Sequence, residues 1–409
     1  MRVDYKLSDK FDFGLFIPAL LLILIGLVAI YSATISHPTA SGNFERQAAW
    51  SVISFIVFII VYFIPSNSFK LLSLPVYLTS LVLLLAVITA GKTISGQKSW
   101  LILGPIGFQP SELAKLGVIM ALASFLSRKN TDIESFKDIV ITLAIGLAPV
   151  LLVLMEPDLG TSIVFAAVIL TLIFWKGISL FGLFVVLSPG FVAVASLFGT
   201  YPFIGSILVV ITILLLFRKN LFFSASVFAL NLAAGFFADY VYHAFSPHQQ
   251  RRIQAFIDPM TDPLGSGYNS IQAIVAIGSG GMFGKGFLSG NQTQLQYIPE
   301  QWTDFIYCVI GEEFGFIGAV IVLGLFTMLF IRLLKIASST KDEYLSLLVI
   351  GILSVYFIHY LINIGMVIGL FPVIGIPLPF VSYGGSSLLV NVFMLGIAAN
   401  IYRNRKNYT

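Results

Sequence analysis

Apolar runs recur along nearly the whole chain, and many are about as long as the hydrocarbon core of a bilayer is thick. A helix needs roughly 17–25 apolar residues to cross that core, and it satisfies its backbone hydrogen bonds within its own segment. Twelve runs meet or approach this length, near residues 14–34, 47–64, 71–90, 110–127, 139–155, 160–175, 179–198, 203–217, 221–240, 304–331, 344–369 and 383–402. The sequence therefore predicts an all-α polytopic membrane protein with about 12 transmembrane helices, forming a single integral membrane domain over residues 1–409.

Composition and charge support this class and indicate an orientation. Hydrophobic residues make up 58% of the chain and charged residues 10%, far from the values of soluble domains. Lys and Arg accumulate in cytoplasmic loops, and most of the 23 fall on one side when both termini are placed in the cytoplasm. The net charge of +4 follows from this bias, so no nucleic-acid partner is indicated.

Cysteine and histidine usage argues against two kinds of chemistry. The single cysteine, Cys308, excludes an intramolecular disulfide. The four histidines are scattered and have no metal-ligand spacing. We therefore predict neither a redox site nor metal-ligating residues.

Three loops on the predicted outer side are longer than the rest. Residues 241–303 hold no continuous span, and because long loops in compact domains are usually functional, we expect this extracytoplasmic loop to form part of an active-site wall. Within it, Tyr268 to Ile277 is typical of a short amphipathic helix, and the glycine run Gly278 to Gly286 is interpreted as a flexible connection. The other two loops run from Gly91 to Gln109 and from Leu370 to Ser382.

Asp304 lies where the longest outer loop enters an apolar helix. An Asp at a helix start commonly caps free backbone N–H groups, and spacing alone does not separate capping from catalysis. Below Asp304, the small residues Cys308, Gly311, Gly315 and Gly318 recur at helical spacing and allow close helix packing in lipid. We therefore expect Asp304 to point into a protein-lined cavity.

Two pairs of ionisable residues inside predicted spans are candidates for buried charge. Glu312 and Glu313 lie roughly 12 Å along the helix from Asp304, and acids at that depth normally pair with a base and mark function. Glu112 and Lys115 are three residues apart and share a helix face, which makes them the expected partners. A structural ion-pair network and direct catalysis both remain open for these residues.

Two further charged groups each allow two interpretations. Glu156 and Asp158 lie in a very short connection between two spans. This position favours helix capping over a catalytic role. Arg251 and Arg252 could bind a diphosphate through bidentate hydrogen bonds, or could hold the loop to anionic headgroups.

Six motifs are more specific together than any one of them. In chain order they are FQPSELAK at 108–115, EPDLG at 156–160, DPLGSGY at 262–268, PEQWTDFI at 299–306, GEE at 311–313 and SYGGSS at 382–387. Their combination and order, over nearly the whole chain, resemble the SEDS (shape, elongation, division and sporulation) family. Two stretches, Pro299 to Phe305 and Ile376 to Val381, look more like its elongation branch (RodA) than its division branch (FtsW).

The resemblance implies a peptidoglycan glycosyltransferase that polymerises lipid II at the outer face of the bacterial plasma membrane. It also implies a partner, a class B penicillin-binding protein that acts as a transpeptidase. The residue that matches the family's essential acid is Asp304. A carboxylate can take the proton of the attacking sugar hydroxyl as undecaprenyl diphosphate leaves, with inversion at the anomeric carbon.

The remaining candidate residues follow from this chemistry. The predicted substrate-binding residues are Lys115, Glu112, Arg251, Arg252 and Lys98. The predicted supporting residues are Glu312, Glu313, Asp158, Ser382 and Tyr383. A divalent cation could share the neutralisation of the diphosphate, but no ligand cluster demands one and no other cofactor is predicted.

Two departures from the family pattern and two rival functions complete the prediction. The family core has ten spans, so the segments near 203–217 and 221–240 are expected to be an inserted pair that preserves sidedness. Relatives carry more arginine near residues 95–100. This chain has Lys98 there, and its ammonium group lacks the fork geometry of a guanidinium group. A lipid II flippase, or a membrane scaffold without catalysis, would fit the same many-span architecture.

Overall fold

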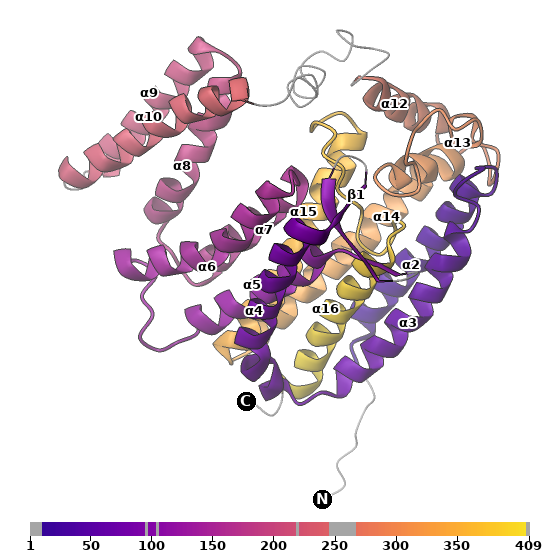
Figure 1. Cartoon of the computed structure of the whole chain (residues 1–409), viewed down its shortest axis with the longest axis horizontal. Helices are drawn as coiled ribbons and strands as arrows, with labels where there is room; N and C mark the ends of the chain where they lie inside the picture. The colour runs from indigo at the N-terminus through magenta and orange to yellow at the C-terminus, as the bar shows by residue number, and fades with distance from the viewer. Residues whose placement is uncertain (1–9, 95–96, 104–105, 218–220, 245–266, 406–409) are drawn as a thin grey trace, which may run out of the picture.

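The computed structural model of the chain describes residues 10–94, 97–103, 106–217, 221–244 and 267–405. Within these residues, long helices coincide with the twelve predicted runs (Figure 1). They are α2 (Phe13–Thr34), α3 (Asn43–Phe63), α4 (Ser66–Ala90), α5 (Pro110–Leu126), α6 (Phe136–Met155), α7 (Leu159–Trp175), α8 (Leu180–Leu197), α9 (Thr200–Phe217), α10 (Leu221–Ala244), α14 (Ile306–Ser339), α15 (Glu343–Val367) and α16 (Gly385–Asn404). The prediction of an all-α polytopic membrane protein is confirmed.

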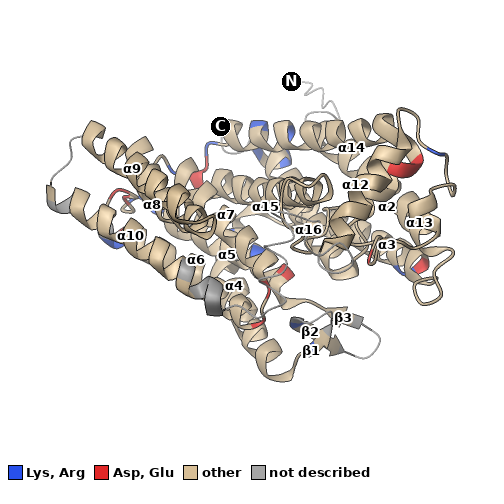
Figure 2. Ribbon diagram, turned by 90° about the horizontal axis from the view of Figure 1, so that it is seen from above, with Lys and Arg blue, Asp and Glu red and all other residues tan. Residues whose placement is uncertain are grey.

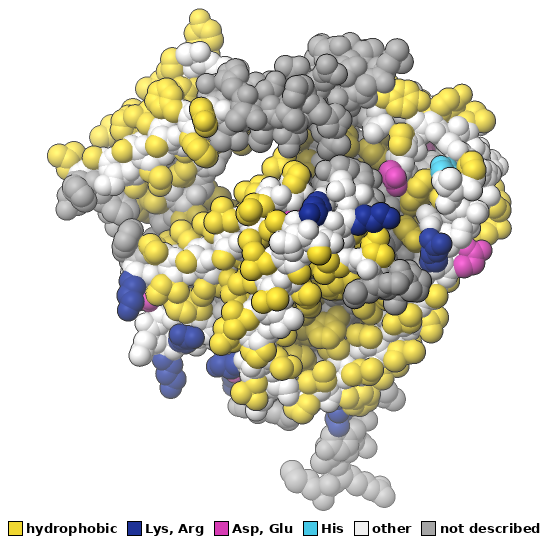
Figure 3. Space-filling model, in the orientation of Figure 1, with side chains coloured by type: hydrophobic (Ala, Val, Ile, Leu, Met, Phe, Trp, Pro, Cys, Tyr) yellow, Lys and Arg dark blue, Asp and Glu magenta, His cyan; other side chains and the backbone are white. Residues whose placement is uncertain are grey.

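Span length and burial divide these helices into a centre and a periphery. In the described ranges, nine helices are long and apolar enough to cross a membrane. The most apolar windows of α15 and α16 are 72% and 78% buried, against 17% for α8 and α9. The short helix α5 has 17 residues, and neighbours cover most of them. Hydrophobic side chains spread over the outer face seen in Figure 3, as contact with lipid requires.

Close packing at the centre depends on small residues. Gly117 on α5 lies against α4, where an added Cβ would come within 3.2 Å of the Tyr77 Cα. Because lipid offers no hydrophobic gain for helix association, such close backbone approach is what holds helices together. Any larger residue at Gly117 would push α4 away from the helix that carries Glu112 and Lys115.

The two ends of the described chain meet at one end of the bundle. Tyr62 donates a hydrogen bond to the Lys10 carbonyl at 2.9 Å, and Arg403 donates to the Tyr62 carbonyl at 3.1 Å. Nearby, Arg332 on α14 forms an ion pair with Asp12 at 2.6 Å. The ribbon positions of other charged residues lie mainly at helix ends and in loops (Figure 2). The first and last described residues therefore lie at the same end of the bundle.

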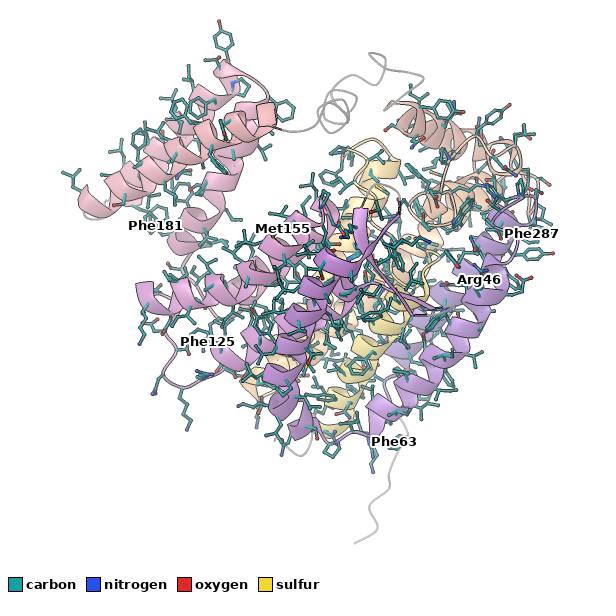
Figure 4. The ribbon with its side chains drawn as sticks, in the orientation of Figure 1. Arg46, Phe63, Phe125, Met155, Phe181 and Phe287 are labelled. Carbon is teal, nitrogen blue, oxygen red and sulfur yellow. The ribbon has the colours of Figure 1, made fainter. Side chains whose placement is uncertain are left out.

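Helices α8, α9 and α10 form a unit of their own. They enclose a separate small core of five buried residues, Phe181, Val192, Val210, Leu214 and Val227. Asn231 on α10 donates a hydrogen bond to the Ser188 hydroxyl on α8 at 3.0 Å. The unit stands apart from the main bundle, with Phe181 at its base (Figures 1 and 4). The segments predicted as an inserted pair, α9 and α10, belong to this unit.

The outer segment between α4 and α5 differs from the predicted loop. It forms a three-stranded antiparallel sheet of β1 (Lys92–Ile94), β2 (Gln97–Leu103) and β3 (Ile106–Phe108). Trp100 is paired with Lys92, and Leu101 with Phe108. The strands are too short to give an alternating pattern that stands out beside apolar runs of about 20 residues. The sheet brings Trp100 toward the end of the bundle where α5 begins.

A second outer segment holds α12 (Tyr268–Gly280) and α13 (Asn291–Gln294). The amphipathic helix predicted from Tyr268 to Ile277 is confirmed as α12. The two helices lie beside α14 and α2 at one end of the bundle (Figure 1). The glycine run between them therefore approaches α14 directly.

This glycine run closes a break in α14, so its interpretation as a flexible connection is wrong. Gly315 interrupts the helix with φ +67° and ψ −162°. The amide of Lys285 donates to the Glu312 carbonyl at 3.0 Å, and the amide of Phe316 donates to the Gly281 carbonyl at 2.9 Å. These bonds satisfy backbone groups that the break would otherwise leave unpaired.

We expect Gly315→Ala to lower stability, because its backbone conformation is essentially restricted to glycine. An added Cβ would also lie 2.3 Å from the backbone nitrogen of Gly284. The strain alone is about 1–3 kcal/mol, which thermal unfolding of the purified protein should register as a lower melting temperature.

Gly324→Ala is the matched control, since it lies in the same helix with no atom within 4 Å of an added Cβ. It should be neutral, or stabilising by up to about 1 kcal/mol through helix propensity. Equal melting temperatures for the two variants would contradict the strained break.

Candidate active site

A cavity of about 370 Å³ lies where the outer segments meet the bundle. Its wall combines residues from the sheet, from the starts of α5 and α7, from the segment before α14, from α15 and from the loop before α16. Four carboxylates line it: Glu112, Asp158, Glu300 and Asp304. Because α14 and α16 begin here and end beside the described termini, the cavity lies at the opposite end of the bundle.

Asp304 occupies the predicted place in a protein-lined cavity. Helix α14 begins at Ile306 and its N-cap residue is Phe305, so Asp304 is not the capping residue. Its carboxylate oxygen Oδ2 is 3.3 Å from the position that a Cβ on Gly375 would take. A side chain at Gly375 would crowd this carboxylate, and Gly375 has φ +83°, which favours glycine.

Asn363 on α15 holds the backbone around Asp304, and sequence analysis did not identify it. This fully buried side chain donates hydrogen bonds to the carbonyls of Asp304 at 2.9 Å and Ile376 at 2.7 Å. One amide therefore joins the segment before α14 to the loop before α16. The signal available in the sequence was an Asn within an apolar helix. A buried Asn normally has hydrogen-bond partners, so this residue could have been expected to hold another segment.

Ser382 and Tyr383 tie the same two segments together, as their predicted supporting role requires. The Ser382 hydroxyl donates to the Thr303 carbonyl at 2.6 Å and accepts from the Leu378 amide at 2.8 Å. The Tyr383 amide donates to the Trp302 carbonyl at 2.9 Å. The position of Asp304 is thus fixed by bonds on both sides of it.

Glu112 and Lys115 form the expected ion pair, with 2.9 Å between Lys115 Nζ and Glu112 Oε1. Lys115 is 1% exposed. Its ammonium also lies 3.1 Å from Nε2 of His359 on α15, and Nδ1 of that ring lies 3.0 Å from the Pro377 carbonyl. A carbonyl can only accept, so Nδ1 carries the proton and Nε2 accepts from Lys115.

The network of Glu112, Lys115 and His359 shapes the inner wall of the cavity. Glu112 and His359 line the cavity, while Lys115 lies behind them. His359 was discounted as a scattered histidine, because only the fold brings α15 against α5. The structure therefore adds His359 and Asn363 to the predicted set of site residues.

Glu312 and Glu313 have other partners than those predicted. Glu312 accepts hydrogen bonds from Lys285 Nζ at 2.8 Å and from the amides of Gln292 and Thr293 at 2.9 Å. Glu313 accepts from the Ser32 hydroxyl on α2. The predicted pairing of Glu312 with Lys115 is wrong. The donors to Glu312 come instead from the segment from α12 to α13, which packs against α14.

Glu156 is the C-cap residue of α6 and Asp158 is the N-cap residue of α7, and the side chain of Glu156 is also a buried acid. Asp158 accepts from the Thr161 amide at 2.9 Å and from its hydroxyl at 2.7 Å, which caps α7 as favoured. It also faces the cavity. Glu156 is 1% exposed, and burial, with a further contribution from the nearby Asp158 charge, raises its pKa from 4.5 to about 8.

The remaining predicted residues do not add to the described wall. Lys98 donates to the carbonyls of Ile88 at 2.8 Å and Thr89 at 3.0 Å, at the end of α4. Arg251 and Arg252 lie outside the described residues. Among residues the structure does describe, no group of three or more His, Cys, Asp or Glu could hold a metal ion.

Fold and site define a polytopic membrane protein with a carboxylate-lined cavity at one end of its helical bundle. The model of the FtsW/RodA/SpoVE family, described as cell cycle proteins, matches residues 13–203 and 181–407. The chain belongs to this family, and the SEDS resemblance is confirmed.

Relatives and solved structures extend the match over nearly the whole chain. The peptidoglycan glycosyltransferase MrdB of Escherichia coli K12 is 35% identical over 392 residues, covering 95% of this chain and 94% of that protein. Stage V sporulation protein E of Bacillus subtilis is 34% identical and covers 96% and 97%. The name of MrdB supports the predicted enzyme class.

The similar structures have the same fold. RodA of Thermus thermophilus has 26% identity and a TM-score of 0.64, with 97% of both chains covered. A chain from a peptidoglycan synthase complex, solved to show the structural coordination of polymerization and crosslinking, has 27% identity and a TM-score of 0.73, covering 97% of this chain and 98% of that one.

We expect Lys115→Met to destabilise the protein by about 3–5 kcal/mol, because it leaves the Glu112 carboxylate buried without its cation. The double variant Lys115→Met/Glu112→Gln should recover most of that loss. Lys176→Met is the control for an exposed pair, since Glu343 is 49% exposed, and it should cost less than about 1 kcal/mol. Thermal unfolding measures all four proteins. A double variant no more stable than Lys115→Met would contradict a coupled pair.

We also expect stability to fall as pH rises from about 4.5 to about 8, because in that range the folded state keeps a proton on Glu156 that the unfolded chain has lost. The contribution is up to about 1.4 kcal/mol per pH unit. Glu156→Gln should flatten the dependence of the melting temperature on pH. Glu134→Gln, which removes an exposed acid, should leave the slope unchanged.

Proposed function

We propose that this chain is a peptidoglycan glycosyltransferase that polymerises lipid II into β-1,4-linked glycan strands during cell-wall elongation. The observation that carries the proposal is the position of Asp304 in a cavity that also presents Glu112, with Lys115 bonded behind that wall. The names of MrdB and of other relatives support the substrate class.

The reaction is a single displacement. The Asp304 carboxylate takes the proton from the 4-hydroxyl of the acceptor N-acetylglucosamine as that oxygen attacks the anomeric carbon of the donor. The bond from that carbon to undecaprenyl diphosphate breaks, and the diphosphate leaves with the electron pair. An α-linked donor thereby gives a β-linked product. The backbone bonds from Asn363 and Ser382 keep the carboxylate in one place, which is the contribution of a rigid frame to catalysis.

Lys115 acts as a positioning residue in this mechanism. Its ammonium donates to Glu112 and His359, which line the cavity while Lys115 itself lies behind them. In this mechanism Glu112, Lys115 and His359 together orient the inner wall of the cavity toward the sugar or the diphosphate.

The charge of the leaving diphosphate needs cations from elsewhere. The described lining residues include four carboxylates and neither Lys nor Arg. We therefore assign this neutralisation to Arg251 and Arg252 in the loop of residues 241–303, since guanidinium groups bind phosphates in a bidentate manner. The described residues do not by themselves form a metal site, so no step is assigned to a divalent cation.

Sidedness and partner complete the proposal. The cavity lies at the end of the bundle opposite the described termini, and the Lys and Arg bias places those termini in the cytoplasm. The active site then opens on the extracytoplasmic face, where lipid II presents its sugars. The partner is a class B penicillin-binding protein, in keeping with the similar chain from a peptidoglycan synthase complex in which polymerization and crosslinking are coordinated.

Asp304→Asn should reduce polymerisation of labelled lipid II at least a hundredfold, because a positioned base contributes about 10²–10⁴ to the rate. The purified protein is assayed with its transpeptidase partner, at equal folded yield. Glu300→Gln is the matched control, since it neutralises another carboxylate of the same cavity, and it should retain most activity.

The other outcomes discriminate among functions. Normal glycan ladders from Asp304→Asn, with loss in Glu300→Gln, would make Glu300 the base. Wild-type protein that forms no polymer but moves labelled lipid II across proteoliposomes would be a flippase. Wild-type protein that does neither, even with its partner, would be a scaffold.

A further inference from the structure

A second cavity, of about 430 Å³, lies at the turn between α5 and α6. Three cations line it: Arg128, Lys129 and Lys137. All three are exposed, and the same end of the molecule shows gathered Lys and Arg side chains (Figure 3). This cavity is separate from the candidate active site, because α5 has Glu112 near its start and this turn at its end, roughly 20 Å apart along the helix axis.

The cations at this cavity are not held in ion pairs with any described residue, although Asp138 lies in the lining and Asp132 and Glu134 lie in the same turn. Among the residues the structure describes, none of the three makes an ion pair, whereas Lys115 and Lys285 are each paired with an acid. The one carboxylate in the lining, Asp138, already accepts a hydrogen bond from the Asp132 amide at 2.8 Å. The lining therefore carries three cations and one carboxylate, while Asp132 and Glu134 lie outside it, and this excess of positive charge favours an anion in the cavity.

The floor of the cavity is apolar. This floor consists of the two apolar residues of the lining, which are Phe125, buried at the end of α5, and Ile141, on α6. The Arg128 guanidinium carbon is 5.4 Å from the centre of the Phe125 ring, which orients that cation over the floor. The apolar part of α5 ends here, so the rim stands where a bilayer surface would be.

We propose that this cavity binds the phosphate group of an anionic glycerophospholipid, with the glycerol and the first acyl carbons against Phe125 and Ile141. Basic pockets between transmembrane helices on the cytoplasmic side are typical sites for such headgroups. The charged rim alone would accept any phosphate, and the apolar floor selects an amphiphile. This site does not depend on the glycosyltransferase activity proposed above.

The simpler account of these cations is that they only fix the orientation of the chain in the membrane. That account needs no cavity and no bound lipid. The two accounts therefore differ in whether lipid stays with the purified protein and in whether its retention depends on these side chains.

Native mass spectrometry of the full chain in mild detergent, after addition of phosphatidylglycerol or phosphatidylcholine, tests the proposal. The wild type should retain one phosphatidylglycerol in preference to phosphatidylcholine. Lys129→Gln/Lys137→Gln should reduce retention of phosphatidylglycerol at least tenfold, since each basic residue near the surface contributes to headgroup binding.

Lys92→Gln/Lys335→Gln is the matched control, because it removes two exposed lysines at other places and gives the same net charge. It should retain lipid like the wild type. Both double variants should melt at the wild-type temperature, which separates lost binding from lost fold. Equal retention by the wild type and the Lys129→Gln/Lys137→Gln variant would overturn the proposal. Displacement of the lipid by millimolar inorganic phosphate would overturn the proposal of a lipid ligand and would indicate a site for free phosphate.

Discussion

A charge placed inside this bundle needs a partner there, because lipid supplies none, whereas the buried Glu156, whose carboxylate oxygens have no hydrogen-bond partner among the described residues, keeps its proton up to a pKa of about 8. Three buried acids obey this rule in different ways: Glu112 with Lys115, Glu312 with Lys285, and Glu313 with Ser32. The last two pairings join elements that are separate along the chain, and His359 extends the first from α5 to α15. The part of the cavity wall formed by Glu112 and His359 is thus a consequence of how the protein pairs a buried acid.

The same rule accounts for the rigidity around Asp304. Backbone groups at the end of a bundle lose helical partners, and here side chains replace them: Asn363 bonds the carbonyl of Asp304, and Ser382 bonds that of Thr303. Groups buried for packing therefore also hold the candidate base. Bonds to the backbone thus set the place at which the Asp304 side chain meets the cavity.

Hydropathy was sufficient to predict the helices, because the bilayer fixes their length and composition before any tertiary contact is known. The motifs placed Asp304 at a cavity for a similar reason, since a polar segment next to a buried helix face has few other places to go. The partners of Glu312 were not predictable, because they depend on a glycine run that approaches α14 from another part of the chain. His359 was missed for the same reason, since its contact with Lys115 exists only when α15 packs on α5.

The break at Gly315 changes how the length of α14 should be measured. Its 34 residues would extend about 51 Å as one straight helix, well beyond a hydrocarbon core of about 30 Å. The part after the break, Phe316–Ser339, is about 36 Å long and is sufficient to cross a bilayer by itself. The first turns of α14 are then free of the crossing. The Tyr307 hydroxyl donates to the Ala319 carbonyl at 3.3 Å, so these turns lie back beside the second part of the helix, and the chain just before Asp304 stays level with the end of α2, where Gln301 donates to the Ala33 carbonyl.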